Sequence, residues 1–222
     1  MVLVWGLCGV LLVLALFQSA RSNDARRKAR AGFLDLCLPI FTQPITAVAE
    51  TGFARISGHY CGQMFDLQVV PDSLSLRKLP CLWLLVTVAE PLPVDGSFDV
   101  MLRATGAETF SRFGELPRQT DTPAGFPEGC TIRTDAVGPL PAAMTVGRYL
   151  SGLDKDRLKE LVVAPKGLRL VWLLEEADRQ KYLLYRDAEM GSQPVRADVV
   201  LPLMDGLCTL WGDVMAQIND HG

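Results

Sequence analysis

The sequence predicts an α+β fold in which a single N-terminal transmembrane helix precedes an antiparallel-leaning sheet with flanking helices. Three observations support this prediction. Residues 1–17 carry no polar side chain, strand-like segments follow one another through residues 53–185, and apolar residues recur at helical spacing in residues 200–218. Strands that come in runs, rather than alternating with helices, favour α+β over a doubly wound sheet.

The predicted organisation has three parts. A transmembrane anchor occupies residues 1–20, a basic collar and helical linker occupy residues 21–50, and an α+β globular domain occupies residues 51–222. The composition agrees, because 49% hydrophobic residues and 21% charged residues exclude intrinsic disorder. The net charge of −3 lacks the basic footprint of a nucleic-acid-binding protein.

The N-terminal segment is long enough to cross a bilayer as a helix. At about 1.5 Å per residue, about twenty residues match a hydrocarbon core about 30 Å thick. The alternative is a signal peptide that is cleaved during export. The segment has no basic residue before its apolar run, and cleavage after Ala20 would place Gln18 at the −3 position. We therefore expect an uncleaved signal-anchor and a single-pass membrane protein.

The charge distribution predicts the orientation. Residues 21–30 have a net charge of +4, so the rest of a chain at −3 overall carries −7. Basic residues beside a span stay on the cytoplasmic side, so we expect residues 21–222 to be cytoplasmic. The collar residues that could also bind anionic lipid headgroups are Arg26, Arg27, Lys28 and Arg30.

Several elements are expected after the collar. A second short helix is expected over residues 40–50, and helices are expected over 144–150, 154–163 and 200–218. Residues 104–128 read as a loop rich in Gly and Pro. Residues 81–88 form a continuous apolar run, which predicts a central strand buried on both faces. Further strands are expected over residues 53–58, 64–70, 97–103, 130–134, 168–174 and 181–185.

The last helix carries a wide apolar stripe. Its core residues are predicted to be Leu203, Leu207, Trp211, Val214 and Ile218.

Few residues carry catalytic patterns. The chain has two His residues and lacks the Gly-x-Ser-x-Gly, His-Glu-x-x-His, phosphate-loop and dinucleotide-binding motifs. No Cys-x-x-Cys pair occurs, and the scattered Cys residues are expected as small buried side chains in a reducing compartment. No cofactor or metal is predicted.

The Gly58–Gly62 segment holds the two catalytic candidates, His59 and Cys61. A His two residues from a Cys could lower the pKa of the thiol, whereas the alternative is a tight turn with an inward-packed Cys. Solvated surface is expected for the carboxylates Asp66, Asp72, Asp95, Asp99, Asp154, Asp156, Glu175 and Glu176. The interleaved charges of residues 157–160, Glu160 among them, are likewise expected to form a solvated face.

Three functions follow from these patterns. The first is a membrane-tethered, non-catalytic interaction or scaffolding domain with an unidentified protein partner. The second is a small-molecule or lipid-binding domain with a pocket between the sheet and the C-terminal helix. The third is a thiol-dependent enzyme that uses Cys61.

Overall fold

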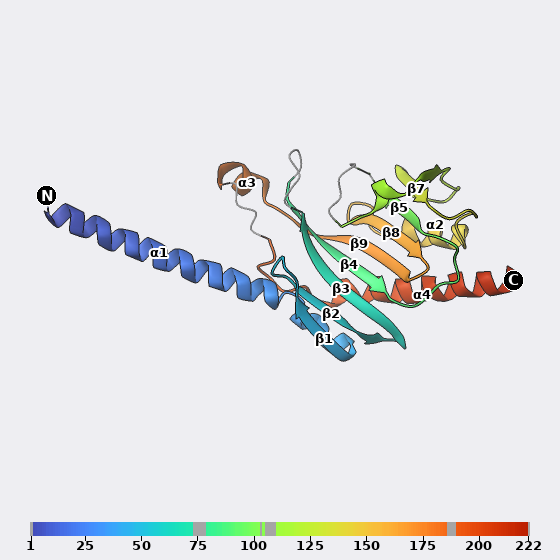
Figure 1. The fold of residues 1–222 in the computed structure, drawn as a ribbon, viewed down its shortest axis with the longest axis horizontal. Coiled ribbons are helices and arrows are strands. Elements are labelled where there is room, and N and C mark those ends of the chain that lie inside the picture. The colour runs from blue at the N-terminus through green and yellow to red at the C-terminus, as the bar shows by residue number, and fades with distance from the viewer. Residues whose placement is uncertain (1, 73–78, 103, 105–109, 186–189, 222) are drawn as a thin grey trace.

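The computed structural model describes residues 2–72, 79–102, 104, 110–185 and 190–221, without the side chains of residues 2–12, 15, 181, 184, 185, 219 and 221. The described strands form one nine-stranded sheet in the order β1-β2-β3-β4-β9-β8-β5-β7-β6, and every pairing is antiparallel. The chain begins with the long helix α1 and ends with the long helix α4, as Figure 1 shows. The α+β prediction with an antiparallel sheet is confirmed.

The first elements are α1 (Val2–Ala31), η1 (Asp35–Ile40) and β1 (Thr42–Val48). The short helix predicted over residues 40–50 is therefore wrong. Pro44 interrupts helical hydrogen bonding, and the β-branched residues that follow it favour the strand that pairs with β2.

The central strands lie where the sequence predicts them. β4 lies between β3 and β9, which confirms its central position in the sheet. Its side chains toward α4 are buried, but Cys81, Trp83 and Thr87 on the other face are only partly buried, so the predicted burial on both faces is wrong. The remaining strands are β2 (Ala54–Tyr60), β3 (Gln63–Asp72), β4 (Cys81–Val88), β5 (Phe98–Leu102), β6 (Arg118–Thr120), β7 (Cys130–Thr134), β8 (Leu158–Ala164) and β9 (Gly167–Glu176).

Two predicted elements exchange their types. The helix predicted over residues 154–163 is wrong, because β8 starts at Leu158 and pairs with β5 and β9. The strand predicted over residues 181–185 is wrong as well, because α3 (Arg179–Tyr185) occupies it. β9 forms a hairpin with β8, and the turn contains Gly167. Its φ of +129° is a backbone conformation that glycine adopts readily and other residues rarely do. A Cβ there would lie 2.0 Å from the Val88 carbonyl oxygen, so the position requires Gly.

The other helices agree with prediction. α2 (Ala143–Ser151) covers the segment predicted over residues 144–150, and α4 (Ala197–His221) covers residues 200–218. The segment predicted as a loop over residues 104–128 contains η2 (Phe113–Glu115) and β6, while residues 105–109 lie outside the described part of the chain.

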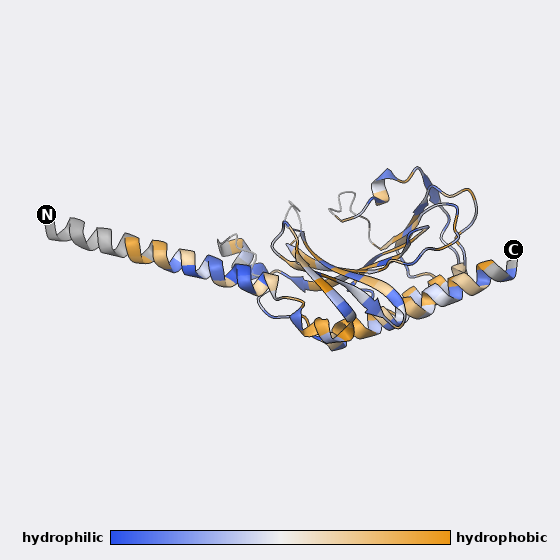
Figure 2. Ribbon diagram, turned by 60° about the horizontal axis from the view of Figure 1, so that its bottom comes forward, coloured by the Kyte–Doolittle hydropathy of each residue, from blue (hydrophilic) through white to orange (hydrophobic). Residues whose placement is uncertain are grey.

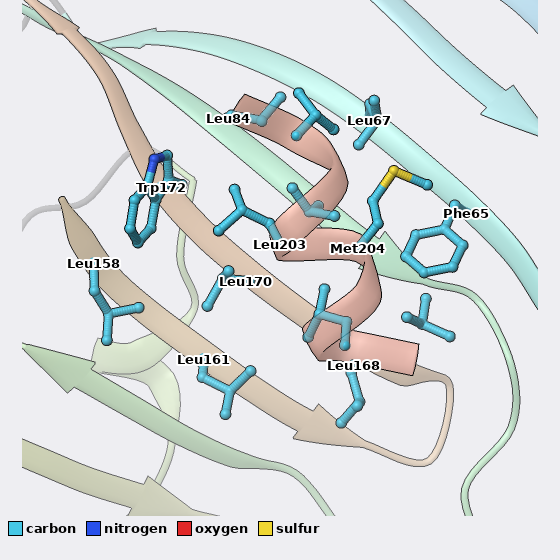
Figure 3. Close-up of a cluster of buried hydrophobic side chains, with 14 of the residues drawn as sticks. Phe65, Leu67, Leu84, Leu158, Leu161, Leu168, Leu170, Trp172, Leu203 and Met204 are labelled. Carbon is cyan, nitrogen blue, oxygen red and sulfur yellow. The ribbon is translucent and has the colours of Figure 1, made fainter. Parts of the chain in front are cut away.

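α4 crosses one face of the sheet and forms the core with it. Figure 3 shows Leu203 and Met204 of α4 directed at side chains of β3, β8 and β9. Leu203, Leu207 and Val214 are buried as predicted, with exposed fractions of 4% or less. Trp211 and Ile218 are only partly buried against this core, and Trp211 Nε1 donates a hydrogen bond to the Glu90 carbonyl at 3.3 Å.

A helix that is both long enough and apolar enough to cross a membrane is found at α4. Within the described residues, the helix long and apolar enough to cross a membrane is Ala197–Ile218, not α1. Its apolar stripe is the side packed on the sheet, which is the pattern of a core helix. α1 projects away from the sheet in Figures 1 and 2, and the anchor predicted over residues 1–20 falls largely on side chains outside the described set.

The junction between α1 and the sheet is packed rather than loose. Phe33 and Leu34 follow α1 directly and are fully buried. The Phe33 ring meets the Phe53 ring edge-on at 5.6 Å, and the Phe33 carbonyl accepts a hydrogen bond from the Val195 amide at 2.8 Å. The Arg30 guanidinium lies 5.3 Å from the centre of the same Phe53 ring. The collar is therefore held at a fixed place against the globular part.

Candidate functional site

The sheet face opposite α4 carries a row of polar side chains. Alternation along each strand sends apolar residues to α4 and their neighbours to this second face. Strand pairing then aligns one residue from each of six adjacent strands, namely Asp66, Thr87, Arg169, Val162, Asp99 and Arg133. These residues are far apart in the sequence, and strand pairing brings them together.

A pocket of about 410 Å³ opens on this face. Its floor is formed by sheet residues that include Thr87, Asp99 and Arg169. The β8–β9 turn contributes Lys166, and the η2 region contributes Arg112. The volume lies within the roughly 300–1,000 Å³ that is usual for small-molecule sites.

Two buried carboxyl groups meet at the base of this pocket. Asp99 of β5 is 2% exposed and Glu160 of β8 is fully buried. The Ser111 hydroxyl donates a hydrogen bond to Glu160 Oε1 and lies 3.4 Å from Asp99 Oδ2. Arg169 Nη2 lies 3.6 Å from Glu160 Oε2. The expectation that Asp99 and Glu160 lie on solvated surface is wrong, because neither carboxyl faces water.

The environment of Asp99 favours its protonated form. Burial first, and then the neighbouring Glu160 carboxyl group, raise the pKa of Asp99 to about 9, against the opposing effects of Arg169 and Ser111. Two carboxyl groups in one dry site cannot both ionise at low cost. We therefore treat Asp99 and Glu160 as a pair that holds one shared proton at neutral pH.

Polar atoms of this cluster are left without hydrogen bonds in the described part of the chain. Asp99 Oδ1 and Arg169 Nε are buried and have no hydrogen-bond partner there. A buried polar atom without a partner costs about 1–3 kcal/mol. A polar ligand that reached these atoms could recover part of that cost, which makes the base of the pocket a favourable place to bind one.

The sequence-predicted candidates lie elsewhere, at the turn between β2 and β3. Cys61 is exposed and has a φ of +49°. Its thiol lies near the Tyr60 hydroxyl and the Cys208 thiol of α4, and it contributes to raising the pKa of both groups. The Tyr60 hydroxyl donates to Asp205 Oδ1 at 2.5 Å, which ties the turn to α4.

His59 lies on β2 just before this turn, where it is exposed and pairs with Met64 of β3. No hydrogen bond found among the described residues joins His59 to Cys61. The structure thus gives Cys61 a thiol neighbour, Cys208, that the sequence analysis did not identify. The thiol-enzyme hypothesis stays a prediction.

The pocket predicted between the sheet and the C-terminal helix is not where the described cavities lie. Leu84, Leu168, Leu170 and Met204 fill that interface and are each fully buried. A second cavity of about 320 Å³ lies instead between α1 and the segment 190–192, and Arg26 and Arg30 line it.

Sequence reasoning missed the carboxyl pair because its members are 61 positions apart and meet only through β5–β8 pairing. A usable signal was present in β5, where Asp99 sits between the apolar residues Phe98 and Val100. Comparison with protein-family models, with curated proteins and with solved structures found no match to the chain.

Proposed function

We propose that the chain is a membrane-tethered, non-catalytic binding domain that receives a small polar ligand on the sheet face opposite α4. The observation that carries this proposal is the 410 Å³ pocket with buried Asp99 in its lining and no hydrogen-bond partner for Asp99 Oδ1 among the described residues. Ligand pockets combine a formed cavity with a few convergent polar groups of perturbed pKa, and this site has all three properties.

The site supports binding more than catalysis. A general acid or base must come within hydrogen-bond reach of the reacting group. Here Glu160 is fully buried and already bonded to Ser111 and Arg169, so one carboxyl of the pair has no access to a reacting group. The arrangement can present a single titratable carboxyl to a ligand.

The tether in this proposal is α1. Its first part supplies the apolar span, and its last turns supply the collar that would lie at the cytoplasmic surface. The cavity of about 320 Å³ beside Arg26 and Arg30 would allow an anionic lipid headgroup to contact both side chains. Arg27 and Lys28 extend the same basic region, with Lys28 paired to Asp24 at 3.0 Å on the exposed surface.

A second candidate is interaction with a protein through β1. This strand forms one end of the sheet, and all seven of its residues are exposed, with Ile45 at 68% and Val48 at 60%. An exposed edge strand can accept a further strand from a partner. This candidate retains the interaction-domain reading of the sequence.

The ligand pocket is tested by screening a library of small polar metabolites for binding to the full-length chain in detergent, read by ligand-observed NMR. Val162→Trp fills the pocket from its wall, and Thr87→Val removes a lining hydroxyl with little change in shape. Val48→Trp is the matched control, because it adds the same side chain to the far edge strand.

We expect the library to yield ligands whose binding is lost in Val162→Trp, weakened in Thr87→Val and unchanged in Val48→Trp. Ligands that bind all three variants equally, or a screen without a ligand, would contradict the proposed pocket. If Val162→Trp does not fold, Thr87→Val alone decides the outcome.

A further inference from the structure

We propose that the ligand carries a primary ammonium group that binds at Asp99 and displaces the proton held between Asp99 and Glu160. This inference rests on the proposed function and adds the chemical class of the ligand. The exchange is balanced: the ammonium keeps its own protons, the Asp99 carboxyl loses one proton to water, and an ion pair replaces the neutral acid.

The charges at the base of the pocket show what is missing there. Glu160 has its own partners, because Arg169 lies 3.6 Å away and Ser111 donates a hydrogen bond to it. Asp99 shares only the Ser111 hydroxyl, at 3.4 Å, and the hydrogen bond with Glu160. Among the described residues, Asp99 is the carboxyl group of this cluster without a basic partner, so a positive charge beside it can come from a proton or from a ligand.

Arg133, the base paired with Asp99 across the β5–β7 ladder, is directed elsewhere. Arg133 lies directly across from Asp99 on β7, but its guanidinium lies over the Phe113 ring, 5.7 Å from the ring centre. Its Nε atom is buried and has no hydrogen-bond partner among the described residues. Arg133 is thus directed to the η2 wall and away from the carboxyl pair.

The walls of the pocket are balanced in charge. Arg112 is paired with Glu115 at 2.6 Å. Asp135 accepts a hydrogen bond from the Ser97 amide at 2.6 Å, and the lining also contains Lys166, which has the opposite charge. The uncompensated group in the lining is therefore Asp99, and it favours a cation over an anion.

The shape of the site favours an organic cation over a metal ion. The described residues contain no group of three or more His, Cys, Asp or Glu side chains placed to hold a metal. A cavity of about 410 Å³ has room for an organic molecule. A primary ammonium has three N–H donors, so it can donate to Asp99 Oδ1 and keep two donors for other acceptors of the ligand site.

Proton displacement gives this inference a distinct pH dependence. Below the pKa of about 9 that burial gives Asp99, each bound ammonium must release one proton. The apparent affinity should then rise about tenfold for each pH unit between pH 6 and pH 8, because one proton is exchanged per ligand. A ligand anion that accepts the Asp99 proton would lose affinity over the same range.

The test compares three two-carbon probes that differ in charge: ethanolammonium, glycolate and ethylene glycol. Binding to the full-length chain in detergent is measured by calorimetry at pH 6, 7 and 8 in two buffers of different ionisation enthalpy, which counts the protons released. Asp99→Asn removes the titrating carboxyl while keeping the side-chain shape. Asp121→Asn makes the same change at an exposed loop position and is the matched control.

We expect ethanolammonium to bind with release of one proton and an affinity that rises about tenfold per pH unit. Asp99→Asn should remove both effects, and Asp121→Asn should leave them unchanged. Preference for glycolate or ethylene glycol, absence of ethanolammonium binding, or binding without proton release would overturn the inference. If the library screen still yields ligands that Val162→Trp blocks, only the ligand class is refuted; if it does not, the proposed function falls as well.

Discussion

Replacing Asp99 with Asn should make the stability of the protein less sensitive to pH. Asp99 is 2% exposed, and its pKa in the folded chain is raised to about 9 by burial and by Glu160. In the unfolded chain the same group titrates near 3.9. Between these two values the native state holds a proton that the unfolded chain has lost, so unfolding is favoured increasingly as pH rises.

The size of this effect follows from proton linkage. Each pH unit in this window lowers the free energy of unfolding by about 1.4 kcal/mol at most, so the loss between pH 6 and pH 8 is about 3 kcal/mol. Asn keeps the shape of the neutral acid and does not titrate. The stability of the Asn variant relative to the natural chain should therefore increase by about 3 kcal/mol over this range, which is about 6–12 °C in melting temperature for a chain of this size.

The assay is urea unfolding of the full-length chain in detergent at pH 6, 7 and 8, followed by Trp fluorescence. Asp121→Asn serves as the exposed control and should track the natural chain at each pH. Parallel stability curves for Asp99→Asn and the natural chain would refute the reasoning, because they would mean that Asp99 does not carry the extra proton. A difference in the free energy of unfolding that is the same at every pH would reflect packing alone. The deciding quantity is the slope of that free energy with pH.

The remaining predictions concern the core, the turn and the tether. Leu207→Ala should destabilise the chain by about 2–5 kcal/mol in urea unfolding, whereas Leu183→Ala at an exposed position should change it by less than about 0.5 kcal/mol, and equal effects would contradict the core assignment of α4. The neighbouring Cys61 and Cys208 thiols should form a disulfide with the thiol oxidant diamide, which takes up the two electrons and two protons. Mass spectrometry would detect the loss of two hydrogen atoms, and the loss should be absent in a Cys208→Ser variant. Selective alkylation of Cys61 that depends on His59 would instead favour the thiol enzyme. A reporter active only outside the cytoplasm and fused to Gly222 should give no signal, and a strong signal would overturn the cytoplasmic placement.

The sequence predicts the strands best where periodicity and composition agree. The continuous apolar run of β4 is typical of a strand, and the apolar stripe of α4 is typical of a helix. The structure confirms both element types. Residues 154–163 mislead because their charged side chains at helical spacing suit an exposed helix. Pairing with β5 and β9 outweighs that local preference, since Leu161 and Val163 are fully buried in the sheet.

The candidate site could not be predicted from short sequence motifs, for a different reason. The pair of Asp99 and Glu160 depends on strand order and register, which place β5 beside β8 although η2, β6, β7 and α2 separate them along the chain. A carboxylate in a strand is expected to be exposed to solvent unless the neighbouring strands of the sheet are known. His59 and Cys61, by contrast, lie two residues apart in the sequence and are easy to notice there, but their turn is tied to α4 by the Tyr60–Asp205 hydrogen bond.

The most direct test of the central claim is an NMR titration of the Asp99 side-chain carboxyl, assigned with the Asp99→Asn variant. It is recorded on the full-length chain without ligand and with a saturating ligand from the polar library. The account predicts that Asp99 is protonated at neutral pH in the free chain and changes its carboxyl shift when the ligand binds, with deprotonation if the ligand is an ammonium compound. An Asp99 carboxyl that is ionised at neutral pH in the free chain, or that has the same shift with and without bound ligand, would contradict it.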